Sequence, residues 1–416
     1  KATFTAMMRF WAGGAYHQMG ERHTETIYLM PRTDLSEIKR EGTVVFDSHG
    51  DTTKALTTLG MQVQGVKEIT DETLSNAKLL IVGRNTNPTP FRGKIINFAK
   101  QGGRVIVLSQ ASDFILGTGI PEPDTKHVAS QVWKASPNHP VIKPFGDEQF
   151  SFWKPDHIGT KFNFTKLSVG GIRYLLHCGG LGGMAWSPLV EVPQNKGTIL
   201  LCQMQVIDAA EAEPMAGALL KSMIQYALDY QTPDTQTLRV LAANDNVTQV
   251  LKASGVTFTN GLEGSGPILV DASHQLNSAE IHEINSTLSR GGKVWLHGYD
   301  TSNVQAVSDI LGFKPTMSKR DDTVLSVALR GDHPLLDGLS NFDYFWATVQ
   351  LGARRDYFEK GKPTAPIGGL DVLDLPTLDR GQVLGAPALL LDIPKDSGSI
   401  FFDGVTWDKA YATEPG

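Results

Sequence analysis

The chain has 416 residues and a formal net charge of −6 at pH 7, with a pI near 6.0 and a mean hydropathy of −0.16. This length indicates two or three domains, and the composition is that of a globular protein. The negative charge argues against nucleic acid or an anionic membrane as a partner. No apolar run approaches the roughly 18 residues of a membrane-spanning helix.

Residues 1–40 have the alternating pattern of antiparallel strands. Apolar and polar residues alternate in Ala2–Phe10 and again in Glu25–Met30, on either side of a polar connection around Gly20 and Glu21. Such alternation predicts strands with one buried face. Because two or three strands cannot form a stable domain alone, we expect them to be the last strands of a β-sandwich within a longer protein.

From residue 42 the pattern changes to alternating strands and helices. β-branched runs separated by helical stretches predict parallel strands joined by right-handed crossovers, which is a doubly wound α/β sheet. The expected elements are, in chain order, strand Thr43–Phe46, helix Asp51–Leu59, strand Lys78–Val82, helix Phe91–Gln101 and strand Arg104–Leu108.

The same order of elements returns near residue 238. Gly102–Gly103 and Gly291–Gly292 each follow the second helix of their half as stop signals. The expected elements are strand Arg239–Ala242, helix Val247–Ala253, strand Pro267–Asp271, helix Ser278–Leu288 with Ser278 as its N-cap, and strand Lys293–Leu296.

Three sequence motifs also recur in the same order in both halves. Asn138–Ile142 matches Asp332–Leu336, Leu189–Pro193 matches Leu390–Pro394, and Glu213–Pro214 matches Glu414–Pro415. Ordered repeats of this kind predict an internal duplication. We therefore expect a β-sandwich fragment at 1–40, a first α/β domain at 41–234, and a second at 235–416 whose C-terminal helix is missing.

The turn after the third strand shows no nucleophile in either half. A nucleophile elbow needs small residues on both sides, but Ser109 has no flanking glycine and the turn after Leu296 has no Ser or Cys. We identify no base and orienting acid at a recognisable spacing. The Gly179–Gly183 cluster lacks the Lys-Ser/Thr of a phosphate-binding loop and is expected to be a flexible surface loop.

Histidines and cysteines give no prediction of a metal or a cofactor. Cys178 and Cys202 are too few for a disulfide framework, and Cys202 lies in an apolar run that predicts burial. His139 and His333 occupy equivalent places, and a His-Pro turn whose imidazole caps a loop is favoured over a metal or acid–base role.

Acidic residues are expected to have structural roles. Glu213 and Glu414 precede proline at predicted helix starts, where a carboxylate accepts hydrogen bonds from open amides. Three carboxylates near Trp153 are expected to be solvated loop charges rather than an acidic pocket: Asp147, Glu148 and Asp156.

Aromatic residues in the long irregular stretches are candidates for sugar contact, because carbohydrate rings stack on exposed indoles. Trp153 and Trp346 recur in both halves, so shared packing is the alternative. The candidate sugar-contact residues are Trp153, His157, Trp186, Trp346 and Trp407.

Residues 153–228 resemble the C-terminal region of large bacterial glycoside hydrolase family 2 (β-galactosidase-like) proteins. The resemblance rests on Ser187–Glu191, Lys196–Met204 and Glu213–Pro214. At the level of fold, both halves are similar to class I glutamine-amidotransferase-like domains, including the β-galactosidase trimerisation domain. The histidine-proline motif at 139 and 333 resembles trehalose-utilisation-type members of that fold.

This sequence departs from amidotransferases because neither elbow carries their nucleophilic cysteine, which puts amidotransfer in doubt. The β-galactosidase trimerisation domain also lacks the catalytic triad. In family 2 hydrolases the two catalytic glutamates belong to a barrel domain, and no part of this chain fits a (β/α)8 barrel.

The resemblance therefore implies a non-catalytic accessory region of a polysaccharide-degrading glycoside hydrolase, which positions glycan or builds subunit contacts. The implied partners are a carbohydrate, an upstream catalytic domain of the same chain and further copies of the protein, in a periplasmic or extracellular location. Two alternatives are a hydrolase or amidase of the amidotransferase-like fold with an atypical site, and a purely structural oligomerisation module.

Overall fold

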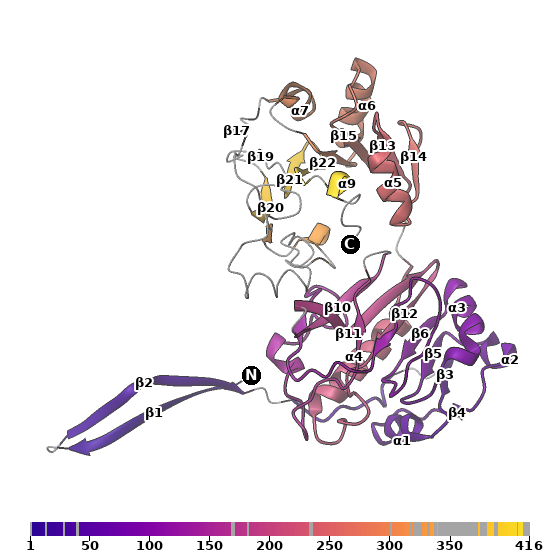
Figure 1. The fold of residues 1–416 in the computed structure, drawn as a ribbon, viewed down its shortest axis with the longest axis vertical. Coiled ribbons are helices and arrows are strands. Elements are labelled where there is room, and N and C mark those ends of the chain that lie inside the picture. Colours follow the sequence, from indigo (N-terminus) through magenta and orange to yellow (C-terminus); the bar gives the residue numbers. More distant parts are fainter. Residues whose placement is uncertain are drawn as a thin grey trace, which may run out of the picture.

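Two α/β bodies and a two-stranded hairpin make up the described part of the chain in the computed structural model (Figure 1). The structure describes residues 2–12, 15–27, 30–38, 41–167, 171–180, 183–232, 236–299, 302–313, 315, 318–319, 327–330, 333–336, 339, 373–374, 381–386, 390–405 and 407–410. Within these ranges no helix is long and apolar enough to cross a membrane.

The N-terminal hairpin consists of β1 (Ala2–Ala12) and β2 (Ala15–Ile27), which pair antiparallel with Ala2 opposite Ile27. The prediction of antiparallel strands is confirmed. The predicted connection around residues 20 and 21 is wrong, because both lie within strand β2, whose pairing with β1 begins at Ala15 opposite Ala12. Membership of a β-sandwich stays a prediction.

The first α/β body is built on a mixed sheet in the order β4-β3-β5-β6-β12-β11-β10-β8, with β7 and β9 beside β11. The first five strands are parallel and the others run antiparallel to their neighbours. The strands are β3 (Thr43–Phe46), β4 (Gly65–Val66), β5 (Leu79–Val82), β6 (Arg104–Val107), β7 (Pro123–Asp124), β8 (Trp133–Lys134), β9 (Asn163–Thr165), β10 (Arg173–Gly180), β11 (Gly183–Gln194) and β12 (Gly197–Cys202).

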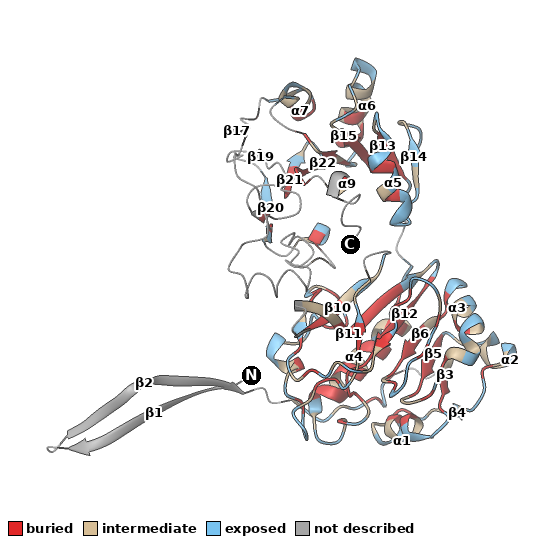
Figure 2. Cartoon of the chain, in the orientation of Figure 1, coloured by how far each residue is buried: buried red, intermediate tan, exposed pale blue. Residues whose placement is uncertain are grey.

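Helices cover both faces of this sheet, because its central strands are apolar on both sides. Ile106 of β6 packs in a core with Leu56 and Leu219, whereas Val105 packs in a second core with Ile95 on the opposite face. Figure 2 shows the resulting buried strands between exposed helical faces. The helices are α1 (Asp51–Thr58), α2 (Asp71–Ser75), α3 (Arg92–Lys100) and α4 (Pro214–Asp229), with short 3-10 turns η1 (Thr89–Phe91) and η2 (Asp147–Phe150).

The second body repeats this strand order, as β14-β13-β15-β16-β22-β21-β20-β18. The predicted α/β class is therefore confirmed for both halves, while their common origin stays a prediction. The strands are β13 (Leu238–Leu241), β14 (Phe258–Asn260), β15 (Ile268–Asp271), β16 (Lys293–His297), β18 (Ala328–Leu329), β20 (Gln382–Ala386), β21 (Leu390–Lys395) and β22 (Gly398–Asp403), with β17 (Ser318–Lys319) and β19 (Leu373–Asp374) as a separate pair.

Helices of the second body also lie on both faces of their sheet. Ile284 of α6 and Ile310 of α7 belong to one core, and Val247 of α5 belongs to another, which also contacts Trp407 of α9. These helices are α5 (Asp245–Ala253), α6 (Ser278–Ser289), α7 (Val304–Leu311) and α9 (Trp407–Ala410), with the 3-10 turn η3 (Pro334–Leu336). The predicted loss of a C-terminal helix concerns residues 411–416, which lie outside the described ranges.

Several local predictions need correction. Gly179, Gly180 and Gly183 of the predicted surface loop lie instead in β10 and β11, where Gly180 pairs with Gly183, and residues 181–182 lie outside the described ranges. The N-cap of α6 is Asn277 rather than Ser278, because the Asn277 side chain accepts from two backbone amides and Glu280 completes the capping box. The antiparallel strands β8, β10 and β11, and the helices α2 and α7, were not predicted.

Close backbone contact at Gly197 gives a first testable prediction. A Cβ atom there would lie 2.0 Å from the Gly103 oxygen and 2.4 Å from the Ala99 oxygen. Because neither backbone atom can rotate away, we expect Gly197→Ala to lower the free energy of unfolding by about 3 kcal/mol in urea denaturation.

The matched control is Gly93→Ala in α3, where a Cβ atom would meet nothing within 4 Å. Alanine is favoured over glycine in a helix, so this variant should be more stable by about 0.5–1 kcal/mol. Equal effects of the two substitutions would contradict the predicted clash.

Candidate functional site

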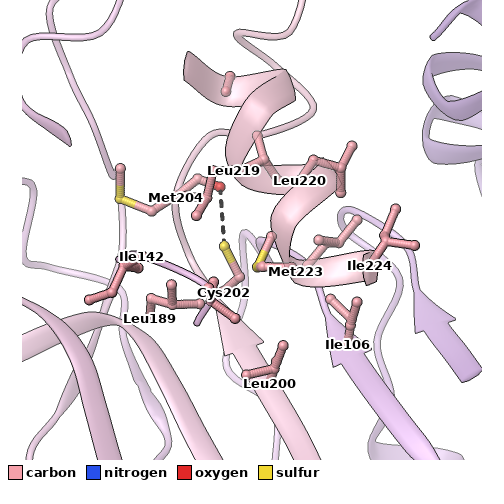
Figure 3. Close-up of a cluster of buried hydrophobic side chains, with 14 of the residues drawn as sticks. Ile106, Ile142, Leu189, Leu200, Cys202, Met204, Leu219, Leu220, Met223 and Ile224 are labelled. Carbon is pink, nitrogen blue, oxygen red and sulfur yellow. Dashed lines mark hydrogen bonds between the residues drawn. The ribbon is translucent and has the colours of Figure 1, made fainter. Parts of the chain in front are cut away.

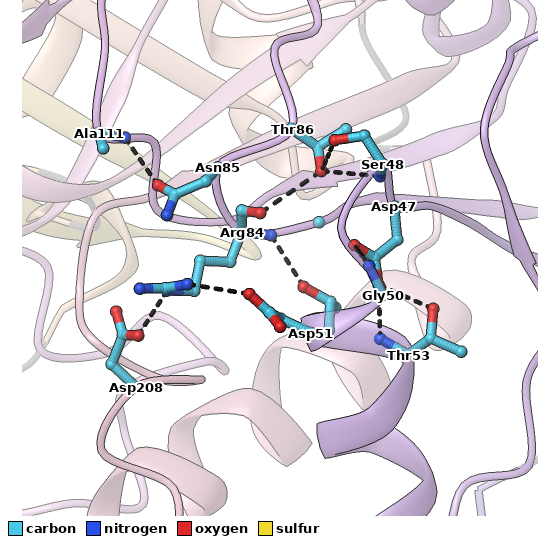
Figure 4. A network of polar contacts seen from close by, with 12 residues as sticks. Asp47, Ser48, Gly50, Asp51, Thr53, Arg84, Asn85, Thr86, Ala111 and Asp208 are labelled. Atoms are coloured by element: carbon cyan, nitrogen blue, oxygen red, sulfur yellow. Dashed lines mark hydrogen bonds and ion pairs between the residues drawn. The ribbon is translucent and has the colours of Figure 1, made fainter.

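The loops after β3 and β5 form a polar network at the carboxyl edge of the first sheet (Figure 4). The chain runs from β3 to β4 on one side and from β5 to β6 on the other, and doubly wound domains place ligands at such a point. The Asp47 carboxylate accepts hydrogen bonds from Gly50 N at 2.9 Å and from Thr53 N and Oγ1 at 2.8 Å each. Asp47 is buried, so it holds the β3–α1 turn in place.

Arg84 connects this network to two further segments. Its backbone N donates to Thr52 Oγ1 at 2.8 Å, and its guanidinium pairs with Asp51 at 3.2 Å and with Asp208 at 2.5 Å. The Arg84 guanidinium therefore links the start of α1, which carries Asp51, to the loop that carries Asp208.

The strand ends that could carry a nucleophile hold Ser109 and Cys202. The Ser109 carbonyl accepts from Asn85 N at 2.9 Å. Cys202 is fully buried beneath α4, among Leu189, Leu200 and Met223 (Figure 3). Burial raises the pKa of the Cys202 thiol to about 12, so the thiol stays protonated. The prediction that Cys202 is a buried small side chain is confirmed.

Trp186 is the candidate residue with the best-developed polar surroundings. Its Nε1 donates to Asp124 Oδ2 at 2.9 Å, and its ring stacks on His127 with centroids 3.9 Å apart and planes 6° apart. Asp124 also accepts from Lys126 N at 2.9 Å. The backbone hydrogen bond from Lys126 is the main reason that the pKa of Asp124 is lowered, with the Trp186 hydrogen bond adding to it against the effect of burial.

Asp124 lines a cavity of about 800 Å³, which we call the Trp186 cavity because Trp186 borders it through its hydrogen bond to Asp124 without lining it. Three neighbouring antiparallel strands assemble it, because Asp124 on β7 and Trp186 on β11 both flank β9, where Thr165 pairs with Trp186. The side chains that line it and can contact a ligand are those of Arg92, Ile115, Thr118, Glu122, Asp124 and Thr165.

The other candidate sugar-contact residues that the structure describes do not line this cavity either. Trp153 is 1% exposed and its Nε1 donates to Gln149 O at 2.8 Å, so it has no free ring face and the packing alternative applies. His157 is exposed in a loop, with a φ of 60°. The Trp407 Nε1 donates to Asp403 Oδ2 at 2.7 Å. Trp346 lies outside the described residues.

The acidic residues that were expected to have structural roles lie at a helix start and at exposed positions. Glu213 is the N-cap of α4 and accepts from Met215 N at 3.1 Å, so its capping role is confirmed. Glu414 lies outside the described residues. The three carboxylates near Trp153 are exposed, as predicted: Asp147, Glu148 and Asp156.

His139 and His333 occupy equivalent positions and make equivalent contacts. The Nδ1 of His139 accepts from Val141 N at 3.3 Å, and that of His333 accepts from the amide two residues on at 3.2 Å, so the predicted loop capping is confirmed. Each Nε2 also meets a carboxylate at 3.2 Å, Glu191 in the first half and Asp392 in the second. These partners were missed.

Glu191 is a fully buried carboxylate with four partners. Besides His139, it contacts Arg173 at 3.1 Å, Thr198 Oγ1 at 2.9 Å and Tyr226 OH at 2.7 Å. Burial alone would raise the pKa of Glu191, but these hydrogen bonds and positive charges lower it to about 2. The cluster lies where β12 begins, at the opposite edge from the strand ends, and ties β11, α4 and the His139 turn together.

The strand ends of the second sheet carry a charged group that sequence reasoning also missed. Asp271, His297 and Asp403 are register neighbours at the ends of β15, β16 and β22. His297 Nδ1 lies 3.4 Å from Asp403, and its Nε2 lies 3.1 Å from Asp408 of α9. Both ring nitrogens of His297 therefore contact a carboxylate, and the imidazole connects α9 to the sheet. Among the described residues no set of three or more His, Cys, Asp or Glu side chains is arranged for a metal ion.

Neither a protein-family model nor a curated protein matches the chain. Similar solved structures include a cytoplasmic protein from Salmonella typhimurium (11% identity, 54% of this chain and 95% of that chain, TM-score 0.30). A ThuA-like protein from Bacteroides uniformis has 11% identity over 50% and 97% of the two chains, with a TM-score of 0.32. A β-galactosidase from Rahnella sp. R3 has 15% identity over 44% and 31%, with a TM-score of 0.30. The likeness to all three is loose, and no functional conclusion rests on it.

Proposed function

We propose that the chain is a non-catalytic, carbohydrate-associated accessory region of a polysaccharide-degrading enzyme, and that it contacts glycan at the Trp186 cavity. The supporting observation is that the Trp186 indole orients Asp124, which lines an open cavity together with Glu122 and Arg92. The proposal includes the expected periplasmic or extracellular location and an upstream catalytic domain as the partner.

The chemistry of the Trp186 cavity suits a neutral oligosaccharide. Sugar hydroxyls both donate and accept hydrogen bonds, and the cavity offers acceptors on Asp124 and Glu122 and a donor on Arg92. The apolar C–H face of a sugar needs an apolar surface, which Ile115, at 45% exposed, provides. Small-molecule sites of this size combine such an apolar surface with a few placed polar groups.

Two observations support a non-catalytic role. The Cys202 thiol is buried and protonated, with its pKa raised to about 12 by burial, so it is a poor nucleophile. Within the described part of the chain, the Ser109 hydroxyl has no hydrogen bond to a base that would activate it.

A binding experiment with the full chain tests the glycan contact. We expect retention of the chain in gels that contain plant or bacterial β-linked polysaccharides. Trp186→Ala should lose about tenfold in affinity, because Asp124, which lines the cavity, then lacks the hydrogen bond that orients it. Asp124→Asn keeps an acceptor for the indole but removes the charge, and should weaken binding less than Trp186→Ala does.

Trp133→Ala is the matched control, because Trp133 is 38% exposed on β8, which pairs with β10 rather than with the strands that carry Asp124 and Thr165. Equal retention of wild type and Trp186→Ala would contradict the proposed contact. Hydrolysis of aryl glycosides by this chain alone would contradict the non-catalytic role and favour the hydrolase alternative. Self-association without glycan retention would favour the oligomerisation module.

A further inference from the structure

A second cavity of about 560 Å³ lies beside α1 in the first body, apart from the Trp186 cavity. Its wall is formed by the loop after β3, one side of α1 and the residues that follow β4. It therefore opens near the carboxyl ends of β3 and β4, which are adjacent parallel strands. This is the edge at which doubly wound domains bind ligands.

The charges that line this cavity are unbalanced. Lys54 comes from α1 and Lys67 from the segment after β4, and His49 lies in the loop between β3 and α1. Both lysines are exposed, and neither makes an ion pair within 4 Å in the part of the chain that the structure describes. In a chain of net charge −6, two unpaired ammonium groups on one concave surface favour an anion.

The only carboxylate in the lining is already engaged. Asp47 is 3% exposed, and its oxygens accept from Gly50 N and from Thr53 N and Oγ1. Asp51, the acidic residue at the start of α1, pairs with Arg84. Neither acid is therefore placed to neutralise the two lysines.

The hydroxyl groups of the lining are also committed. Thr57 Oγ1 donates to Thr53 O at 2.9 Å, and Thr58 Oγ1 donates to Lys54 O at 3.0 Å. Of the lining side chains that the structure describes, Lys54, Lys67 and His49 carry N–H groups that can face a ligand. Recognition in this cavity would therefore depend on charge more than on a fixed pattern of hydrogen bonds.

From this geometry we infer that the cavity beside α1 binds a small oxyanion, through Lys54 and Lys67. A phosphate ester, a sulfate ester and a sugar carboxylate share this chemistry. The cavity is separate from the Trp186 cavity, so the inference goes beyond the proposed function and its test uses different residues.

The test is a titration of the full chain with inorganic phosphate, inorganic sulfate and glucuronate, followed by isothermal calorimetry at low ionic strength. We expect saturable binding of at least one of the three anions. The double variant Lys54→Gln/Lys67→Gln should lose about tenfold or more in affinity, and added NaCl should weaken wild-type binding because the contacts are ionic.

The matched control is Lys100→Gln/Lys143→Gln, which removes the same charge from two exposed lysines that do not line the cavity. It should change the affinity less than about twofold. Equal losses in both double variants, or no saturable binding of any anion, would overturn the inference. The anion that binds most tightly identifies the source: dianions indicate a phosphate or sulfate ester, and glucuronate indicates an acidic sugar.

Discussion

Substitution of Glu191 by glutamine is expected to lower the free energy of unfolding of the first body by about 3–5 kcal/mol, because it breaks a buried charge cluster. The neutral amide leaves Arg173 without its carboxylate and places an N–H₂ group against donors that Glu191 now accepts from. Urea denaturation, with hydrogen exchange of β11 and α4 to assign the transition, measures the loss.

The pH dependence gives an independent measurement of the same interaction. Because the pKa of Glu191 is lowered to about 2, its stabilisation is complete above the ordinary value of about 4.5 and is lost as the pH falls through about 2. The free energies of unfolding of wild type and Glu191→Gln should therefore differ most above pH 4.5 and become equal in acid.

Asp392→Asn in the second half is the control. Asp392 has the equivalent histidine contact at 3.2 Å but is partly exposed, with an 18% exposed side chain, and one of its oxygens has no hydrogen bond. We expect Asp392→Asn to lower the free energy of unfolding by about 1 kcal/mol. A loss below 1 kcal/mol for Glu191→Gln, or no convergence in acid, would show that the cluster contributes little to stability.

The parallel core could be predicted from sequence because its signals are local. Runs such as Thr43–Phe46 and Arg104–Val107 are apolar on both faces, and Gly102 and Gly291 end their helices with φ of 106° and 87°. Neither signal depends on residues far away in the chain. The parallel pairings of β5 with β6 and of β15 with β16 follow from these short strand–helix–strand units, whereas the edge strands β4 and β14 were not predicted.

The antiparallel half of each sheet could not be predicted in the same way. β7 and β9 are two and three residues long, which is too short for a visible alternation. Asp124 and Trp186 are far apart in sequence and meet only because β9 lies between their strands. The surroundings of Trp186 therefore depend on strand pairing that the sequence pattern does not show.

The carboxylate partners of His139 and His333 could have been predicted from the sequence. Glu191 and Asp392 occupy the same place in the two matching motifs Leu189–Pro193 and Leu390–Pro394. An acidic residue retained in an otherwise apolar strand in both halves indicates a buried partner. Which cation it would meet could not be read from the sequence, because the contact spans a separate loop.

The pH dependence of the second body is expected to follow His297. Burial lowers the pKa of His297, but hydrogen bonds and charges from Asp403 and Asp408 outweigh it and raise the pKa to about 9. A raised pKa means that the stabilisation is complete below the ordinary value of 6.5 and is lost as the pH rises through about 9. We expect a loss of about 3 kcal/mol over that interval, measured by urea denaturation with the fluorescence of Trp295 and Trp407.

His297→Gln removes the charge and should be less stable than wild type at pH 6.5, with little further change up to pH 9. The comparison variant is His274→Gln, because His274 is 25% exposed and pairs with Glu280 at 3.0 Å on the surface. Its alkaline loss should match that of wild type. Either a flat wild-type profile or an unchanged slope in His297→Gln would contradict a charged imidazole there. If the alkaline loss of stability persists in His274→Gln but is absent from His297→Gln, it arises at the contact between β16, β22 and α9.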